Sequence, residues 1–270
     1  MTRLIPFACM ALLFWSCTPS AKYMLTFHPI QGETYHYVVS EVTHTVSTEN
    51  GQKVGRNQNV FVAFRCRLKD KQTNGVTIGM DEFSLHEQRD GKAEKNVSVN
   101  GTGTDLTCDL DQTGDITGIN GLENMYAQLD PSWRQRFGEG YFARLMGKGW
   151  GTFPGASVRE GDTWDGLDSL NADPRIPVAT RYTLLKNRGG ILLIKTDADV
   201  DLSNTALAGT THGGQLTLKG RQRGVWRIDA LTGMVLGGQT VLQAEGTLTT
   251  IKGTIPMYID STCSVNVPGA

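Results

Sequence analysis

The sequence predicts a mainly β protein (α+β), with long antiparallel strands in two related halves that form a curved half-barrel or barrel and a helical hairpin between them. Three observations support this prediction. Apolar and polar residues alternate over long runs such as Val60–Leu68, which is typical of half-buried strands. Helical periodicity occurs within one central stretch, Leu122–Trp164. Features that precede this stretch return after it in the same order, as in an internal repeat.

Residues 1–17 are expected to be a processing signal rather than part of the fold. Arg3 precedes an apolar run, Leu4–Trp15, that is too short to span a bilayer as a mature helix. The end of the run at Cys17 resembles a bacterial lipoprotein signal. This resemblance implies cleavage before Cys17 and lipidation of its thiol. The alternative is an ordinary secretory signal peptide with an incidental cysteine.

A lipidated cysteine carries several acyl chains, which suffice for stable membrane anchoring. The residues after Cys17 lack the acidic cluster that marks surface export in such bacteria. We therefore expect a lipid-anchored protein of the cell envelope, on the periplasmic face of the outer membrane. Residues 18–31 begin polar and are expected to be a tether.

The first β half is expected over residues 32–120. The segment Tyr35–Val46 is rich in Tyr, Val and Thr, which favour strands. A hairpin turn is expected at Asn74-Gly75, because both residues tolerate positive φ. The apolar residues expected to face inward fall on even positions up to Met80 and on odd positions from Phe83. We therefore expect a β-bulge near Asp81-Glu82.

The helical segment is expected over residues 121–151. Asp130-Pro131 suits a helix start, with Asp at the N-cap and Pro at the first helical position. Glycines from Gly147 onward are expected to end the helix in left-handed geometry. The apolar positions recur at helical spacing, namely Leu122, Met125, Tyr126, Leu129, Trp133, Phe137, Tyr141 and Leu145.

This apolar stripe has two interpretations. An amphipathic helix normally packs its apolar face on a core, and here the sheet would supply that core. Alternatively, the helices form a lid over an apolar cavity. In that case the ligand-binding residues are Met125, Trp133, Phe137 and Tyr141.

The second β half is expected over residues 152–268. Gly32-Glu-Thr-Tyr35 is echoed by Gly161-Asp-Thr-Trp164, and Phe64–Leu68 by Thr180–Leu184. A third echo joins the turns Asp111-Gln-Thr-Gly114 and Asp229–Gly233. The alternative to a repeat is that hairpin proteins reuse the same turn chemistry.

Composition and cysteine content limit the function classes. Lys and Arg total 26 against 27 Asp and Glu, and this balance argues against nucleic acid, which needs concentrated positive charge. Cys66, Cys108 and Cys263 alternate with apolar neighbours and should point into the core. One disulfide could form in an exported protein, with Cys66–Cys108 as the favoured pair, although pairing cannot be read from sequence.

No catalytic motif is present. The chain lacks the G-x-S-x-G, H-E-x-x-H and phosphate-loop patterns, and Gly147–Gly151 has no Ser or Thr after its lysine, so it is interpreted as a linker. Asp197, Asp199 and Asp201 could attract Ca²⁺, but alternation places them on a solvated outer face. We expect no metal, no cofactor and no enzymatic activity.

Turn and strand-start motifs carry a resemblance over nearly all the mature chain. They are Phe153–Val158 leading to Gly161–Trp164, Asp111–Gly114 before a helical block, and Ile228–Gly233 before a long strand. The set resembles a family of Bacteroidota-type lipoproteins known only as a domain of unknown function. More remotely, it is similar to lipoprotein-carrier half-barrels, which hold acyl chains under helices.

Two functions therefore remain open. The first is an envelope protein that binds an apolar ligand or lipid beneath the central helices. The second is a structural or interaction lipoprotein with a filled core and a protein partner. Beyond the membrane contact of Cys17, the sequence identifies neither ligand nor partner.

Overall fold

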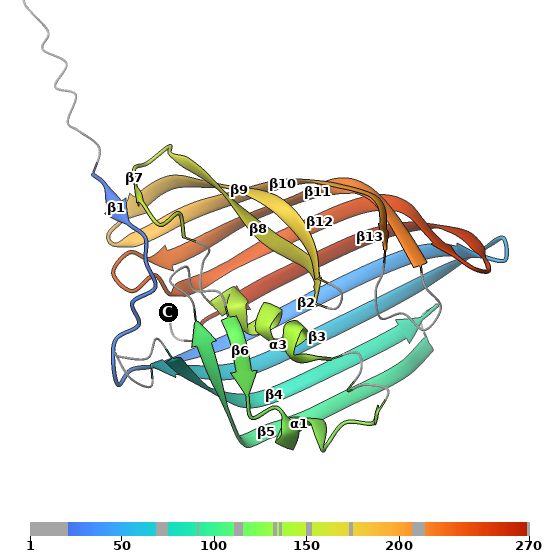
Figure 1. Ribbon diagram of the computed structural model, residues 1–270, viewed down its shortest axis with the longest axis horizontal. Helices are drawn as coiled ribbons and strands as arrows, with labels where there is room; N and C mark the ends of the chain where they lie inside the picture. Colours follow the sequence, from blue (N-terminus) through green and yellow to red (C-terminus); the bar gives the residue numbers. More distant parts are fainter. Residues whose placement is uncertain are drawn as a thin grey trace, which may run out of the picture.

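The computed structural model shows an 11-stranded antiparallel sheet that curves into an open half-barrel (Figure 1). The sheet does not close, because its order runs β6-β5-β4-β3-β2-β13-β12-β11-β10-β9-β8 and leaves β6 and β8 as edges. The predicted fold class is therefore confirmed, as the half-barrel rather than the barrel. The structure describes residues 21–68, 75–90, 92–110, 116–131, 134, 137–149, 153–172, 175–206 and 214–268.

Each half of the sheet is a meander of neighbouring strands. The first half contains β2 (Thr34–Glu49), β3 (Gln52–Leu68), β4 (Gly75–Arg89), β5 (Lys92–Leu110) and β6 (Ile116–Asn120). The second half contains β8 (Thr163–Ala172), β9 (Arg175–Arg188), β10 (Ile191–Ala206), β11 (Gly214–Asp229), β12 (Val235–Thr250) and β13 (Gly253–Asn266). The halves join where β2 pairs with β13.

The two halves correspond in register as well as in strand order. Gly32 and Gly161 both have positive φ, 88° and 90°, two residues before β2 and β8 begin. Tyr35 lies opposite Cys66, and the equivalent Trp164 lies opposite Tyr182. Tyr35 and Trp164 match in the sequence echo, and their cross-strand partners, Cys66 and Tyr182, match as well. The Asp111–Gly114 turn lies outside the described residues.

Local signals along the strands also match the structure. Val60, Val62, Phe64 and Cys66 face the core. A register shift between Ala63 and Phe64 leaves Asp81 without a partner on β3, which confirms the bulge. The β9–β10 turn uses Gly189 and Gly190 at positive φ. Asn74 lies outside the described residues, and β4 begins at Gly75.

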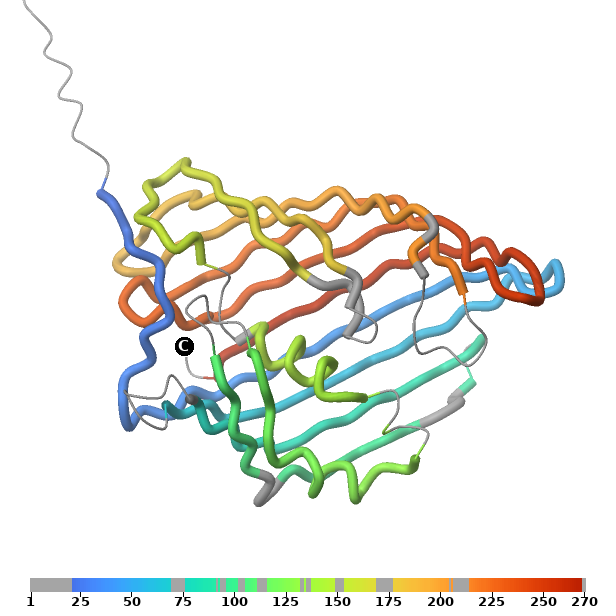
Figure 2. The backbone as a smooth tube through the Cα atoms, viewed as in Figure 1, coloured from blue at the N-terminus to red at the C-terminus, as the bar shows by residue number. Residues whose placement is uncertain are grey.

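The helical segment crosses the concave face from the β6 edge to the β8 edge (Figures 1 and 2). It contains α1 (Glu123–Tyr126), α3 (Glu139–Met146) and the 3-10 turn η1 (Gly147–Gly149). Helix α3 packs against β6 and β8, while α1 packs against β5 and η1 against β2. The helices therefore cover the concave side where the main core lies.

Two helical predictions need correction. The run from Trp133 to Leu145 is not one helix, because Gly138 is extended (φ −69°, ψ 174°) and α3 begins after it. Gly147 does not take left-handed geometry either: its φ is −59°, and the chain continues as η1. Glycine permits both conformations, so its presence alone did not decide between them.

The tether expected over residues 18–31 is partly folded. Tyr23–Met24 forms β1 and pairs with Ser157–Val158, which forms β7. Leu25 is buried in the main core. The apolar residues in this segment explain the difference, because they gain by packing on the end of the half-barrel.

The three described cysteines are buried and free, so the Cys66–Cys108 bridge does not form. Strand β4 lies between the strands that carry them. Two strand spacings separate their backbones by about 10 Å, beyond the reach of a disulfide. Burial raises the pKa of both thiols to about 12, as suits inert core cysteines.

Gly246 provides a test of the sheet's close strand packing. A Cβ on Gly246 would collide with the Thr217 carbonyl and the Leu218 Cα atom on β11. We expect Gly246→Ala to lower the free energy of unfolding by about 2 kcal/mol, in the range typical of overpacking. Urea unfolding followed by tryptophan fluorescence would measure the change.

Gly147→Ala is the matched control. Its φ is helical and no atom lies within 4 Å of the new Cβ, so stability should stay level or rise by up to about 1 kcal/mol. Equal unfolding midpoints for the two variants would contradict the proposed steric role of Gly246.

Candidate functional site

The residues expected to line a ligand cavity lie, where described, in the packed core. Met125 and Phe137 are fully buried and Tyr141 is 8% exposed. The rings of Phe137 and Tyr141 are 4.7 Å apart, and Phe83 contacts Phe137 edge-on at 5.2 Å. Trp133 lies outside the described residues. These aromatic contacts fill the space beneath α3 and give these side chains a packing role.

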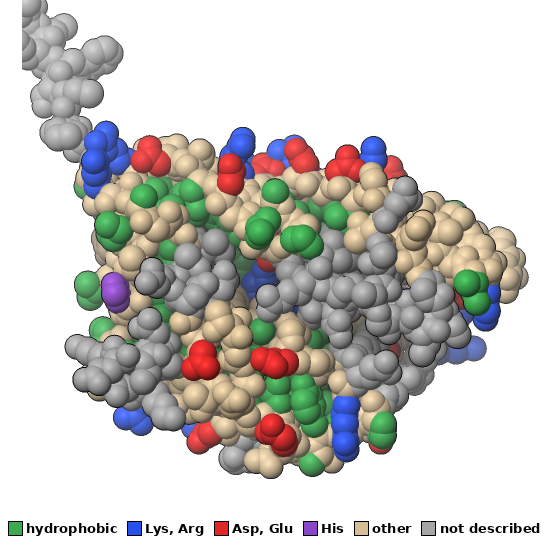
Figure 3. All heavy atoms as spheres, viewed as in Figure 1, with side chains coloured by type: hydrophobic (Ala, Val, Ile, Leu, Met, Phe, Trp, Pro, Cys, Tyr) green, Lys and Arg blue, Asp and Glu red, His purple; other side chains and the backbone are tan. Residues whose placement is uncertain are grey.

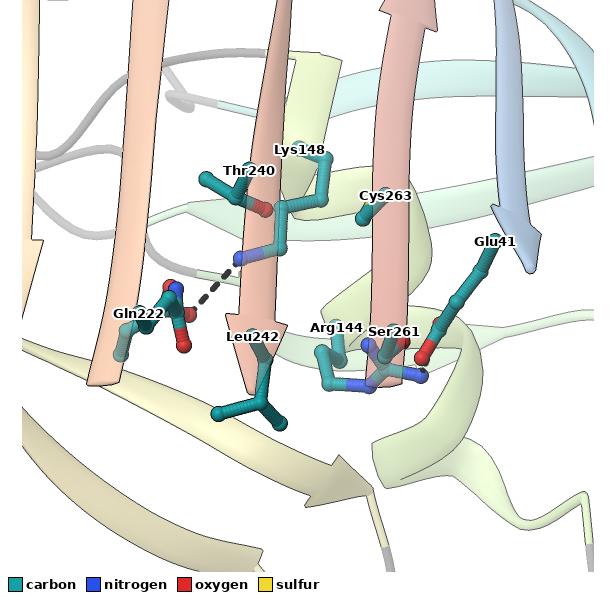
Figure 4. Close-up of a pocket in the computed structure, with 9 residues that line it drawn as sticks. Glu41, Arg144, Lys148, Gln222, Thr240, Leu242, Ser261 and Cys263 are labelled. Atoms are coloured by element: carbon teal, nitrogen blue, oxygen red, sulfur yellow. Dashed lines mark hydrogen bonds and ion pairs between the residues drawn. The ribbon is translucent and has the colours of Figure 1, made fainter. Parts of the chain in front are cut away.

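A different group of side chains crosses the concave face, and we call it the polar belt. It consists of the strand residues Glu41, Asp168, Gln222, Thr240 and Ser261. The positions follow from strand parity, because each points to the same side as the core residues of its strand. Glu41 follows Tyr37 and Val39 on β2, and Gln222 lies between Leu218 and Trp226 on β11. The belt and the helical residues above it line one small cavity: Glu41, Arg144, Lys148, Asp168, Gln222, Thr240, Leu242, Ser261 and Cys263 (Figure 4).

Two ion pairs connect the helical segment to this belt. Arg144 Nη2 lies 2.8 Å from Glu41 Oε2, and Lys148 Nζ lies 2.7 Å from Asp168 Oδ1. In Figure 4, Arg144 reaches toward Glu41, and Lys148 toward Gln222. Gln222 Nε2 donates a hydrogen bond to the other Asp168 oxygen at 2.9 Å. All four charged side chains are largely buried, since none exceeds 16% exposure.

The electrostatics keep both cations charged. Burial lowers the pKa of Arg144, but the charge and hydrogen bond of Glu41, together with the neighbouring Tyr141 and Cys263, raise it, and the net pKa is raised. Lys148 follows the same logic with Asp168 as its partner. Burial raises the pKa of the Cys263 thiol to about 11. Cys263 is therefore protonated at neutral pH, so the cluster lacks a ready nucleophile.

A second apolar region lies beyond the polar belt on the same face. It consists of two buried clusters, one of Leu216, Leu218 and Ala244, the other of Val178, Ala198 and Val200. The half-buried side chains that pack on these clusters are Leu202, Leu242, Met257 and Ile259. The helices pack mainly on β2, β5, β6 and β8. This apolar region, carried by β9 to β13, is therefore separate from the helix-covered core.

The three aspartates on the outer face lie beside basic side chains. Arg221 binds Asp197 with two hydrogen bonds of 2.7 and 2.8 Å and approaches Asp199. Lys219 lies 3.9 Å from Asp201. Among the described residues, no group of three or more His, Cys, Asp or Glu could hold a metal ion. Figure 3 shows both signs of charge mixed along the rim of the second half.

The sequence prediction missed the belt, although part of its signal was present. Glu41, Gln222 and Asp168 are polar residues at inward positions of their strands, and buried polar groups of this kind need partners. In the sequence, Arg144 lies between the apolar positions Tyr141 and Leu145, and Lys148 lies within the glycine-rich segment Gly147–Gly151. Their partners lie 103 and 20 residues away, so local patterns could not pair them.

In the described part of the chain, no helix is both long and apolar enough to cross a membrane.

Comparisons with known proteins identify a family and one shared fold. A model described as "Family of unknown function (DUF6263)" matches residues 65–235. None of the curated proteins matches the chain. A lipovitellin structure concerned with lipid–protein interactions aligns at TM-score 0.55 and 12% identity. That alignment covers 89% of this chain and 25% of the lipovitellin chain, so this chain spans about a quarter of that relative.

A second solved structure aligns much more weakly. It is a domain named for outer membrane lipoprotein sorting, from Vibrio parahaemolyticus, at TM-score 0.16 and 10% identity. The alignment covers 86% of this chain and 83% of that domain. Its TM-score is too low to support an argument about fold or function.

The Arg144–Glu41 pair predicts a large stability effect. Arg144→Met leaves the Glu41 carboxylate buried without its cation, which should cost about 3 kcal/mol of unfolding free energy. The double variant Glu41→Gln/Arg144→Met should lose less, because no uncompensated charge remains. Chemical denaturation at pH 7 would measure both values.

Arg181→Met removes the cation of an exposed ion pair, in which Arg181 and Asp165 are 66% and 72% exposed. Its stability should stay close to that of the unmodified protein, since exposed pairs contribute little. If Arg144→Met costs no more than Arg181→Met, the buried pair has no special role in stability.

Proposed function

This chain belongs to DUF6263, a family of unknown function, and we propose that it binds an apolar ligand or lipid on the concave face of its half-barrel. The observation that carries the proposal is the second apolar region beyond the polar belt. Its half-buried side chains, Leu202, Leu242, Met257 and Ile259, belong to neither the main core nor the helix-covered side.

The shape and lining of this region suit an apolar chain. Strands β9 to β13 contribute the apolar side chains of the two clusters, so the region offers apolar contact area. Ligand sites are typically concave and mostly apolar, with a few polar groups at defined places. The polar belt supplies such groups at one border of the region.

Similarity to lipovitellin adds support at the level of fold. The lipovitellin structure concerns lipid–protein interactions, and its matching part has the same fold as this chain. At 12% identity the likeness transfers no residue and no ligand. It does support the physical point that a curved sheet of this type suits apolar cargo.

The alternative function is a structural or interaction protein of the envelope. The aromatic cluster of Phe83, Phe137, Tyr141 and Phe142 favours it, because these rings pack against one another at α3. We therefore place the ligand beyond the belt rather than beneath Met125 and its neighbours. Both functions are non-enzymatic.

We also propose that the protein is anchored in the cell envelope through a lipidated Cys17. This part rests on the sequence, namely the apolar run Leu4–Trp15 that ends at Cys17, since residues 1–20 lie outside the described part of the chain. The proposed location is the periplasmic face of the outer membrane.

Lipid uptake tests the binding proposal. The purified protein should retain lipid visible by native mass spectrometry, and it should take up a fluorescent fatty acid. Leu202→Gln should weaken uptake at least tenfold, because an amide would be left without partners in the apolar region. Leu185→Gln makes the same change on the outer face, where Leu185 is 41% exposed, and should leave uptake unchanged.

Protein that is recovered without lipid and takes up no fluorescent fatty acid would rule out the carrier function. In that outcome the structural alternative stands. Cross-linking in intact envelopes should then recover a reproducible protein partner.

Metabolic labelling tests the anchor. Radioactive palmitate should label the full-length protein, and Cys17→Ser should abolish the label and release the protein from the membrane fraction. Globomycin should block processing of the unmodified protein. Release of a cleaved, unlabelled protein would instead support the ordinary secretory signal.

A further inference from the structure

The polar cavity contains hydrogen-bond donors that the described residues do not satisfy. The Nε–H of Arg144 is buried and has no acceptor there. Lys148 carries three N–H donors, and its hydrogen bond within the described part of the chain goes to Asp168. Both cations thus keep N–H groups that need an oxygen acceptor, and buried donors left unpaired are costly.

Both carboxylates in the cavity and the Ser261 hydroxyl already have hydrogen-bond partners. The Glu41 carboxylate accepts a hydrogen bond from Arg144, and the Asp168 carboxylate accepts one each from Lys148 and Gln222. The Ser261 hydroxyl pairs with Thr43 at 2.9 Å. The cavity therefore suits a ligand that brings acceptor oxygens. A carboxylate is such a group, and its hydrogen bonds to cations are among the stronger ones in proteins.

The size of the cavity restricts the head group. Its volume is about 40 Å³, and a water position requires roughly 10–15 Å³ by this measure, so it holds about three waters. Two carboxylate oxygens fit in that space. A phosphocholine or a sugar is much larger than this space.

The cavity adjoins the apolar region directly. Leu242 lines the cavity and also packs on both apolar clusters beyond the belt. Leu242 pairs with Ser261 on the neighbouring strand β13. Ile259 lies two residues before Ser261 on the same strand, on the apolar side. A molecule with its polar end at Arg144 and Lys148 can therefore continue along Leu242 onto Met257 and Ile259.

We propose that the ligand is a long-chain fatty acid, with its carboxylate bound by Arg144 and Lys148 and its acyl chain lying along Leu242 over the apolar region. This inference rests on the proposed function and adds the head-group chemistry and the orientation. The carboxylate oxygens share the two cations with Glu41 and Asp168, and the Arg144 Nε–H and the remaining Lys148 N–H groups supply the added hydrogen bonds.

The test compares ligands that differ only in the head group. Palmitic acid, methyl palmitate and hexadecanol are each used to displace the neutral dye Nile red from the full-length protein. Palmitate should bind at least tenfold more tightly than the ester or the alcohol. Acetate should not compete at millimolar concentration, because it lacks the chain that contacts the apolar region.

A matched pair of variants locates the effect. Lys148→Met/Asp168→Asn removes the buried cation and its partner together, so no lone charge remains. It should lower palmitate affinity at least tenfold and leave hexadecanol affinity unchanged. Lys219→Met/Asp201→Asn removes a Lys–Asp pair on the outer face, where the atoms are 3.9 Å apart, and should change neither affinity.

The outcomes separate this inference from the proposed function. Equal affinities for acid, ester and alcohol in the unmodified protein would overturn the carboxylate site and leave apolar binding intact. Acetate binding as strong as that of palmitate would assign the cavity to small carboxylates and overturn the fatty acid. Absence of any dye displacement would overturn both proposals. Because these comparisons use the unmodified protein, they hold even if the cavity variant fails to fold.

Discussion

The attachment of α3 to the curled sheet at three places is the constraint on which the rest of the structure depends. At one edge, the Glu139 carboxylate accepts the Ile119 N–H of β6 at 2.9 Å. In the middle, Arg144 pairs with Glu41 of β2. At the far edge, Lys148 pairs with Asp168 of β8. A half-barrel leaves two strand edges open, and unprotected edges invite pairing with other chains. Here one short helix, with the turn that follows it, holds both edges and buries the aromatic core beneath.

The same arrangement divides the concave face into three zones. Under the helices, rings such as Phe83 and Phe137 fill the interior. At the level of the two ion pairs the lining becomes polar. Beyond them it becomes aliphatic again, around Leu218 and Leu242. Buried charges are costly unless paired, and the pairs here satisfy one another across elements that are distant in sequence. The belt thus separates the helix-covered core from the second apolar region, where we propose that the ligand binds.

Strand alternation made much of this fold predictable. The inward parity of Val60 to Cys66, the bulge at Asp81 and the paired echo of Tyr35 and Trp164 all depend on neighbours within one hairpin, which sequence patterns report directly. The helices were less predictable, because the helical spacing of apolar residues runs through Phe137 and Gly138, where the backbone is not helical. The candidate site was least predictable. Arg144 and Lys148 acquire their roles from partners on β2 and β8, and no local pattern specifies which inward carboxylate meets which cation. The free cysteines show the same limit, since the strand that separates Cys66 from Cys108 is known only from the sheet order.

Under the proposed lipidation of Cys17, the pairing of β1 with β7 would limit the distance between the folded body and the membrane. Five residues lie between Cys17 and Tyr23, where the chain joins the folded body, and the six steps of a fully extended chain cover about 20 Å. With Cys17 embedded in a bilayer, the segment between Cys17 and Tyr23 would be shorter than the strands, which extend roughly 50 Å. The end of the half-barrel that carries β1 would then stay at the lipid surface, while the hairpin between β12 and β13 lies at the opposite end (Figure 1). The concave face, where we propose that the ligand binds, would then extend away from the membrane along the strands.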